Sequence, residues 1–243
     1  MARSRIALIT GANKGIGLET ARQLGRLGIT VLIGSRDQKR GAASVESLKN
    51  EKIDAHLVQL EVTDAGSIAR AAAEIDTTFG RLDILINNAA VQLGPVDAQA
   101  SNTPMKTLRE TFETNFFGLV AVTQAMLPLV RKSQAGRIVN LTSILGSLAE
   151  HADPNSPIFH VKYLGYDTSK AAVNMYTNHL AYELRETKIK VNAAHPGWVK
   201  TDMGGPGAQL ELEDGAKTSV WLATLGEDGP SGGYYHTTVH MRW

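Results

Sequence analysis

The 243-residue sequence contains no cysteine. Disulfide bonds, thiolate metal sites and cysteine nucleophiles are therefore excluded. An excess of one charge is also missing, because 25 Lys and Arg residues face 24 Asp and Glu residues and leave a net charge of +1. That balance predicts neither a nucleic acid nor an anionic membrane as a partner. No stretch approaches the roughly 18 apolar residues of a membrane helix. The apolar run from Ile6 is too short for a signal-peptide core, so we expect a cytoplasmic protein.

Short apolar runs alternate with longer amphipathic runs along the chain. The pattern predicts strands near 6–9, 30–33, 56–60, 84–86, 137–141, 189–194 and 233–238. Helices are expected over 16–27, 38–49, 64–79, 105–131, 166–185 and 214–225. Buried strands that alternate with helices are typical of a parallel sheet covered on both faces. We predict one doubly wound α/β domain of Rossmann type over residues 1–243, with about seven strands.

A glycine-rich segment lies directly between the first predicted strand and the first predicted helix. It reads Thr10-Gly11-Ala12-Asn13-Lys14-Gly15-Ile16-Gly17. Glycines there permit a tight turn and close approach of the backbone to a diphosphate, and the helix N-terminus favours an anion. Because Lys14 precedes its glycine instead of following it, the segment is not the P-loop of nucleoside triphosphatases. It predicts a dinucleotide site, and three turn glycines without a ligand are the alternative.

The end of the second predicted strand indicates which dinucleotide binds. An acidic residue about 20 positions after the glycine segment would favour NAD by binding the ribose 2′-hydroxyl. Here Ser35 and Arg36 stand 18 and 19 residues after Gly17. A hydroxyl and a guanidinium suit a 2′-phosphate, and Lys14 adds a second cation. Asp37 follows at once and would repel the phosphate if it turned inward. The pattern favours NADPH over NADH, and a solvated Arg36 heading a surface helix is the alternative.

Tyr166 and Lys170 are four residues apart in a predicted helix, so both side chains lie on one face, one turn apart. A free phenol has a pKa near 10, too high for efficient proton exchange at neutral pH. A fixed ammonium nearby favours the phenolate and is expected to lower the pKa of Tyr166. This spacing is common on exposed helices, so its weight comes from the surrounding motifs.

Polar residues follow two other predicted strands at the same edge of the sheet. Ser143 lies just past the fifth strand, where α/β sheets bind ligands, and its hydroxyl would bond the same substrate oxygen as Tyr166. Asn87-Asn88-Ala89-Ala90 follows the fourth strand and is expected to tie neighbouring loops together. Asn115 falls inside a long apolar helix, where an amide needs partners. A satisfied core amide and a relay role both stay open for it.

Taken together, these motifs resemble the short-chain dehydrogenase/reductase family over nearly the whole chain. The motifs that carry the resemblance are Thr10-Gly11-x-x-x-Gly15-x-Gly17, Asn87-Asn88-Ala89-Ala90, Asn115, Ser143, Tyr166-x-x-x-Lys170 and Pro196-Gly197. The resemblance implies that Tyr166 is the general acid and base and that Ser143 orients the carbonyl. It also implies that Lys170 binds the nicotinamide ribose and lowers the pKa of Tyr166. Asn115 would hold a water in a proton relay.

The same resemblance implies a set of residues that bind the cofactor. Pro196 to Thr201 would pack on the nicotinamide, with Val199 and Thr201 near its carboxamide. Glu61 stands where the family usually has an aspartate beside the adenine. The full set is Gly11, Asn13, Lys14, Gly15, Ile16, Gly17, Ser35, Arg36, Glu61, Val62, Asn88, Ala89, Tyr166, Lys170, Pro196, Gly197, Val199 and Thr201. The histidines and carboxylates show no metal-ligand spacing, so no metal site is expected. His195 is expected to be a packed loop residue rather than a base.

Finer features resemble the NADPH-dependent carbonyl reductases of the family. They are the glycine segment, the Ser35-Arg36 pair and the run from Pro196 to Met203. Ser143 and Tyr166 are 23 residues apart, more than the usual family spacing. The resulting insertion near 151–163 is expected to border the substrate pocket. It would also disturb the helix interface through which family members associate, so a monomer and a homo-oligomer both stay open.

The sequence therefore predicts NADPH-dependent reduction of a small-molecule ketone, aldehyde or quinone to an alcohol. One alternative is NADP-dependent oxidation of an alcohol on the same residues. The other is a non-catalytic NADP-binding sensor or scaffold, which would need the glycine segment but not Ser143, Tyr166 and Lys170.

Overall fold

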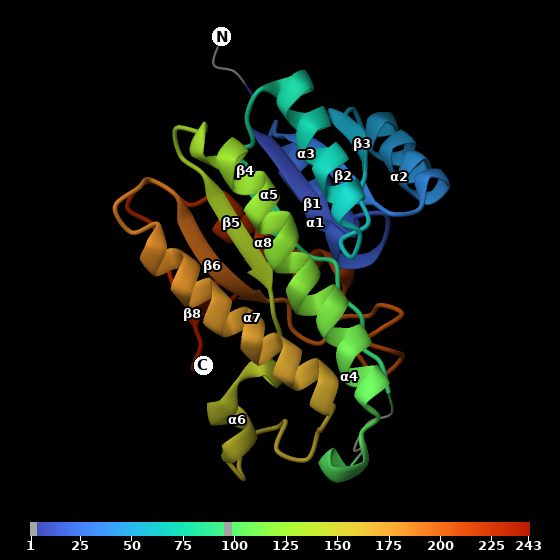
Figure 1. The fold of residues 1–243 in the computed structure, drawn as a ribbon, viewed down its shortest axis with the longest axis vertical. Helices are drawn as coiled ribbons and strands as arrows, with labels where there is room; N and C mark the ends of the chain where they lie inside the picture. The colour runs from blue at the N-terminus through green and yellow to red at the C-terminus, as the bar shows by residue number, and fades with distance from the viewer. Residues whose placement is uncertain (1–3, 95–98) are drawn as a thin grey trace.

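The computed structural model of the protein describes residues 4–94 and 99–243. An eight-stranded sheet forms its centre, in the order β3-β2-β1-β4-β5-β6-β7-β8, with helices on both faces (Figure 1). The first seven strands run parallel, and the short β8 pairs antiparallel with β7. The doubly wound α/β fold predicted from the sequence is confirmed, and β8 is an additional hairpin strand that the sequence pattern did not predict.

The strands are β1 Ile6–Thr10, β2 Thr30–Ser35, β3 Ala55–Gln59, β4 Ile84–Asn87, β5 Arg137–Leu141, β6 Lys190–His195, β7 Tyr234–His236 and β8 Val239–His240. The α-helices are α1 Gly15–Arg26, α2 Gln38–Asn50, α3 Ala65–Phe79, α4 Met105–Phe112, α5 Leu119–Arg131, α6 Leu148–Ala152, α7 Leu164–Glu183 and α8 Leu212–Ala223. Three shorter helical segments are η1 Ala100–Asn102, η2 Glu113–Gly118 and η3 Ile144–Gly146.

Two apolar layers attach the helices to the sheet. Because strand side chains alternate between faces, Leu8, Leu32 and Leu85 pack against α3, α5 and α7. Ile9 and Ile33 face the opposite way and pack against α1, α2 and α8. The order of the strands reverses at β1, which has β2 on one side and β4 on the other. In open α/β sheets, ligands bind beside such a reversal, at the carboxyl ends of the strands.

The predicted helix over residues 105–131 is interrupted in its middle. Residues of η2, including Asn115, form a π-helical turn between α4 and α5. At its end Gly118 packs on the backbone of Val62, and a Cβ on that glycine would lie 2.8 Å from the Val62 carbonyl oxygen. π turns inside helices are frequent at functional sites. The turn places the Asn115 amide beside the site described below.

Two predicted boundaries also shift. Helix α7 begins at Leu164 rather than at Tyr166, and the Asp167 carboxylate accepts the backbone N–H of Tyr163, one of the N–H groups left unpaired at the start of the helix. Strand β6 extends through His195, which the sequence placed in a loop. His195 therefore ends a buried strand, and its side chain is held at the carboxyl edge of the sheet.

Asp83, at the amino end of β4, joins three parts of the chain. Its buried carboxylate accepts the backbone N–H of Ile6 at 2.9 Å, the hydroxyl of Ser133 at 2.6 Å and the Nε of Arg81 at 3.1 Å. We expect Asp83→Ala to lower the free energy of unfolding by about 3 kcal/mol, because three donors lose their acceptor in a buried place. Urea unfolding measures this loss.

Asp76→Ala is the matched control. Asp76 pairs with Lys132 at the surface, where both side chains are about half exposed. Its removal should cost less than about 1 kcal/mol. Equal losses in the two variants would contradict the role given to Asp83.

Candidate active site

The glycine segment forms a close-fitting turn at the carboxyl end of β1. Gly11 has a φ of +63°, and a Cβ there would lie 3.0 Å from the Cα of Ala89. A Cβ on Gly17 would lie 2.6 Å from the side-chain nitrogen of Asn88. No side chain caps the first turn of α1, and no acidic residue lies in it. Its backbone N–H groups are therefore available to an anion.

Thr10 and Asn88 join the glycine segment to the end of β4. The Thr10 hydroxyl accepts the backbone N–H groups of Asn88 and Ala89, each at 2.9 Å. The Asn88 amide donates to the carbonyl oxygens of Thr10 at 2.8 Å and Gly11 at 3.3 Å. The expected tie between these loops is present. Thr10 is a part of it that our sequence-based site omitted, although it opens the glycine motif.

Tyr166 and Ser143 meet at the carboxyl end of β5. The Ser143 hydroxyl lies close enough to the phenol to lower its pKa, and Ser143 also accepts the backbone N–H of Leu145 at 3.2 Å. Tyr166 is only 8% exposed. Burial raises the pKa of Tyr166 to about 12, against a smaller lowering by Ser143.

Lys170 lies one turn after Tyr166 and is buried beneath it. Its ammonium donates to the carbonyl oxygen of Leu141 at 2.8 Å and lies 5.5 Å from the centre of the Tyr166 ring. Burial lowers the pKa of Lys170 to about 8. The pKa of Tyr166 was expected to be lowered by Lys170, but in this structure it is raised. Burial of both groups dominates, so the phenol keeps its proton at neutral pH.

Asn115 reaches helix α7 through Ser169. Its amide donates to the carbonyl oxygen of Val91 at 2.8 Å and to the Ser169 hydroxyl at 3.0 Å. Its oxygen accepts the Val91 N–H at 2.8 Å. The Ser169 hydroxyl in turn donates to the backbone carbonyl of Tyr166 at 2.7 Å. Asn115 is thus a satisfied amide that ties the β4 loop to α7, and a relay role is compatible with that position.

The residues expected near a 2′-phosphate lie at the ends of β2 and β3. The Arg36 side chain is 75% exposed, and its Nη1 lies 3.8 Å from the Glu61 carboxylate. Ser35 does not face solvent as expected of a phosphate ligand, because it is buried and its hydroxyl donates to the carbonyl oxygen of Asp37. Asp37 itself accepts the backbone N–H of Arg40 at the start of α2. Its carboxylate therefore acts as a helix cap.

The remaining expected cofactor residues surround the same edge. The Asn13 carbonyl accepts the Ser44 hydroxyl, and Val62 is buried against Gly118. Pro196 and Gly197 follow β6, and Val199 is buried and bridges to Leu210. Thr201 approaches the glycine segment, since its methyl group would lie 3.8 Å from a Cβ on Gly15. Lys14 forms an ion pair at 2.6 Å with Asp202 in the neighbouring segment.

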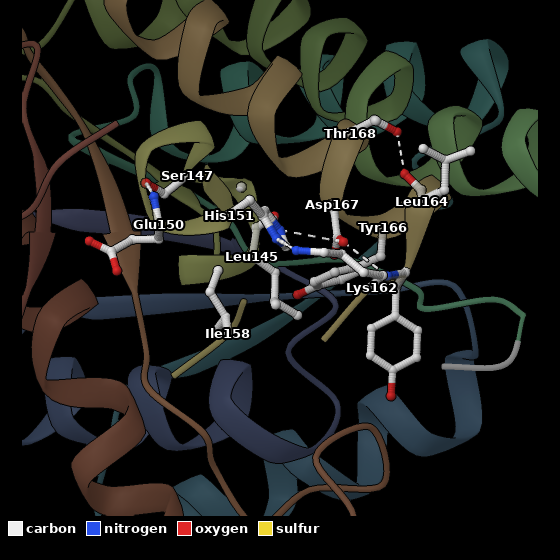
Figure 2. Close-up of polar contacts among 12 residues, drawn as sticks. Leu145, Ser147, Glu150, His151, Ile158, Lys162, Leu164, Tyr166, Asp167 and Thr168 are labelled. Carbon is white, nitrogen blue, oxygen red and sulfur yellow. Dashed lines mark hydrogen bonds and ion pairs between the residues drawn. The ribbon is translucent and has the colours of Figure 1, made fainter. Parts of the chain in front are cut away.

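The insertion before Tyr166 is anchored by a polar cluster (Figure 2). The His151 ring donates from Nε2 to the Leu145 carbonyl at 3.0 Å and lies 3.5 Å from the Asp167 carboxylate. Lys162 donates to the other ring nitrogen at 2.9 Å. Helix α6 and the turns after it lie past the carboxyl end of β5 (Figure 1). The insertion is therefore fastened both to the turn after Ser143 and to α7.

Among residues 4–94 and 99–243, no group of three or more His, Asp or Glu side chains could hold a metal ion. No helix in that part of the chain is long and apolar enough to cross a membrane.

Comparison with known proteins links this site to one family. The family model of the short chain dehydrogenases matches residues 5–209. Carbonyl reductase (NADPH) 1 of Bos taurus is 32% identical, with 98% of each chain covered. A (+)-neomenthol dehydrogenase of Arabidopsis thaliana is 34% identical, with 95% of each covered. The structure of an NADPH-bound carbonyl reductase from chicken fatty liver superimposes with a TM-score of 0.87 and 32% identity, over 99% of this chain and all of that one.

The Asp167 carboxyl gives a pH-dependent stability. Burial raises its pKa from 3.8 to about 6, despite the Tyr163 N–H, His151 and Lys162. Between these values the folded chain binds more protons than the unfolded chain, so this group lowers stability as pH rises through the window. We expect Asp167→Asn to stabilise the protein at neutral pH by on the order of 1 kcal/mol, and by less at the acid end.

Thermal unfolding across that pH range measures the difference between variant and parent. Asp228→Asn, at an exposed carboxyl in a distant loop, is the control, and its difference should not change with pH. A constant difference for Asp167→Asn would refute the assignment.

Proposed function

The chain belongs to the short-chain dehydrogenase family, and from this premise we propose that it is an NADPH-dependent carbonyl reductase. Its reaction would convert a ketone, aldehyde or quinone to an alcohol. Two relatives that align over nearly their whole length are named for carbonyl reduction with NADPH and for the dehydrogenation of neomenthol. Both names describe the interconversion of a carbonyl and an alcohol.

One observation carries the proposal. A buried phenol, a serine hydroxyl beside it and a buried ammonium stand together at the carboxyl edge of the sheet. They come from the turn after β5 and from α7, and the open N-terminus of α1 lies at the same edge. A non-catalytic dinucleotide sensor would have no use for this combination, whose burial is costly.

The residues present fit a dinucleotide phosphate. The glycine segment leaves the N–H groups of the first turn of α1 without a side-chain cap, and the packing of Gly11 and Gly17 leaves no room for a Cβ. Lys14 and Arg36 are exposed cations at the ends of β1 and β2. We assign the 2′-phosphate to these two side chains and not to Ser35. When bound, NADPH supplies a hydride for the carbonyl carbon.

The protein's own part is to hold the carbonyl and to move one proton. The Ser143 hydroxyl would donate to the carbonyl oxygen and orient it beside Tyr166. The Tyr166 hydroxyl then gives its proton to that oxygen, and the product is the alcohol. The phenolate that remains is stabilised by the Lys170 ammonium and reprotonated from solvent, a path in which we place Asn115. Hydride plus proton balance the two atoms that the carbonyl gains.

The protonation state of the phenol favours reduction over oxidation. Burial keeps the pKa of Tyr166 near 12, so at neutral pH the phenol carries the proton that reduction consumes and cannot act as a base. Alcohol oxidation would need the phenolate before the reaction starts. For alcohol oxidation, the bound cofactor would therefore have to lower the pKa of Tyr166 further than it would for carbonyl reduction.

A turnover assay tests the proposal. The purified chain should oxidise NADPH in the presence of aldehydes, ketones or quinones, and faster than it oxidises NADH. Tyr166→Phe should lower kcat by at least about a thousandfold, since the proton donor is lost, while the Kd for NADPH stays within about twofold because the aromatic ring remains. Absorbance of NADPH gives turnover, and a fluorescence titration gives binding.

Tyr182→Phe, on the exposed face of the same helix, is the control and should match the parent. Loss of NADPH binding together with turnover in Tyr166→Phe would mean that Tyr166 acts on the cofactor site instead of donating the proton.

Arg36 should set the choice between the two nicotinamide cofactors. Arg36→Asp replaces a cation with a charge that repels a 2′-phosphate and suits a ribose hydroxyl. We expect the ratio of kcat/KM for NADPH to that for NADH to fall at least about tenfold, a loss of roughly one charge-assisted contact. Arg70→Asp, a similar charge change on the exposed face of α3, serves as the control. An unchanged ratio would remove Arg36 from the phosphate site.

A further inference from the structure

His195 stands between the two turns that border the proposed active site. Its Nδ1 accepts the backbone N–H of Ile144 and the backbone N–H of Gly197, each at 3.3 Å. Ile144 directly follows Ser143, and Gly197 follows Pro196 at the start of the segment expected on the nicotinamide. A single ring nitrogen therefore connects the turn that would hold the carbonyl with the turn that would hold the hydride donor.

The His195 ring is neutral, so its Nδ1 can accept both hydrogen bonds. An imidazole nitrogen accepts a hydrogen bond only when it carries no proton. The His195 ring is buried, and burial with the nearby His236 lowers its pKa to about 3. Nδ1 is therefore an unprotonated acceptor at neutral pH, and the proton of the neutral ring is on Nε2.

The backbone of His195 is held by hydrogen bonds from α8 and β7. The His195 carbonyl oxygen accepts the hydroxyl of Thr218 and the Nδ1 of His236, each at 3.1 Å. The two imidazole rings lie 5.0 Å apart. Because its carbonyl and its ring are both held, His195 has little freedom to follow a movement of either turn.

The turn after His195 has no room to relax either. Gly197 has a φ of +86°, and a Cβ there would lie 2.3 Å from a methyl group of Leu210 and 3.1 Å from the His236 ring. That close packing aims the Gly197 N–H back at the His195 ring. If Nδ1 were lost, two backbone N–H groups at the edge of the site would lose their acceptor.

We propose that His195 is a positioning residue that keeps the Ser143 turn and the Pro196–Thr201 segment in a fixed relation, and thereby aligns the carbonyl with the cofactor. The proposal rests on the proposed carbonyl reductase function. Its specific content is that the acceptor atom at Nδ1 carries the effect, whereas the volume of the ring does not.

Three substitutions separate the acceptor atom from the ring. His195→Asn places Oδ1 at the same number of bonds from the backbone as Nδ1, so both N–H groups keep an acceptor. His195→Gln moves the acceptor one bond farther out. His195→Leu keeps an apolar side chain of moderate size with no acceptor. His179, exposed on α7, receives the Asn and Gln changes as controls.

Each full-length variant is measured for its thermal midpoint, its Kd for NADPH and, with one carbonyl probe, kcat and KM. We expect His195→Asn to stay within about threefold of the parent in kcat and in Kd. His195→Gln and His195→Leu should lose at least about tenfold in kcat and several-fold in Kd while still folded, since a small displacement of a positioned group costs that much. The KM for the carbonyl should change less than kcat.

Loss of activity in His195→Asn equal to that in His195→Leu would overturn the proposal, because the ring would then act by its shape. Full activity in His195→Leu would overturn it as well. If the Leu variant fails to fold, the Asn and Gln pair decides between the same outcomes. The parent could reduce no carbonyl while NADPH still binds more weakly to His195→Gln and His195→Leu than to the parent and His195→Asn. In that case the proposed reaction fails, but the positioning of the cofactor segment by His195 stands.

Discussion

The buried ammonium of Lys170 is the group on which the arrangement of the site depends. A lysine is almost never fully buried without partners, and this one donates to the carbonyl oxygen of Leu141, the last residue of β5. The bond fixes the start of α7 against the end of the strand and so places Tyr166 beside Ser143. Burial lowers the pKa of the ammonium and raises that of the phenol. The two pKa values therefore move apart, and at neutral pH the ammonium is charged while the phenol keeps its proton.

A second constraint keeps this arrangement rigid: side chains bind the strand ends to one another. Thr10 and Asn88 join the ends of β1 and β4. The Asn87 amide donates to Asn140 on β5, which in turn donates to Thr177 on α7. His195 continues the series to the last turn of the site. Ladder hydrogen bonds end with the strands, so these polar side chains extend the connection into loops that the sheet alone would leave free.

The features that the sequence predicts well are those set by residues close together in the chain. The alternation of strands and helices, the glycine segment and the spacing of Tyr166 and Lys170 each depend on residues that are near neighbours, and they anticipate the doubly wound fold. Features that depend on distant packing were missed. Ser35 is buried by Gly41 of the following helix, and the π turn at Asn115 arises where Gly118 meets Val62. The raised pKa of Tyr166 likewise follows from burial, which no motif records.

The charges around the proposed cofactor site show why exposed ion pairs suit a binding site. Lys14 lies against Asp202, and Arg36 lies near Glu61, with most of each cation exposed. Exposed pairs contribute little to stability, so a phosphate dianion can replace either carboxylate partner at small cost. Each carboxylate meanwhile holds its cation in place and limits the freedom that binding must remove. The preference for NADPH then depends on how much more strongly Arg36 binds the 2′-phosphate than the Glu61 carboxylate. The planar guanidinium of Arg36 can bond two oxygens of either group.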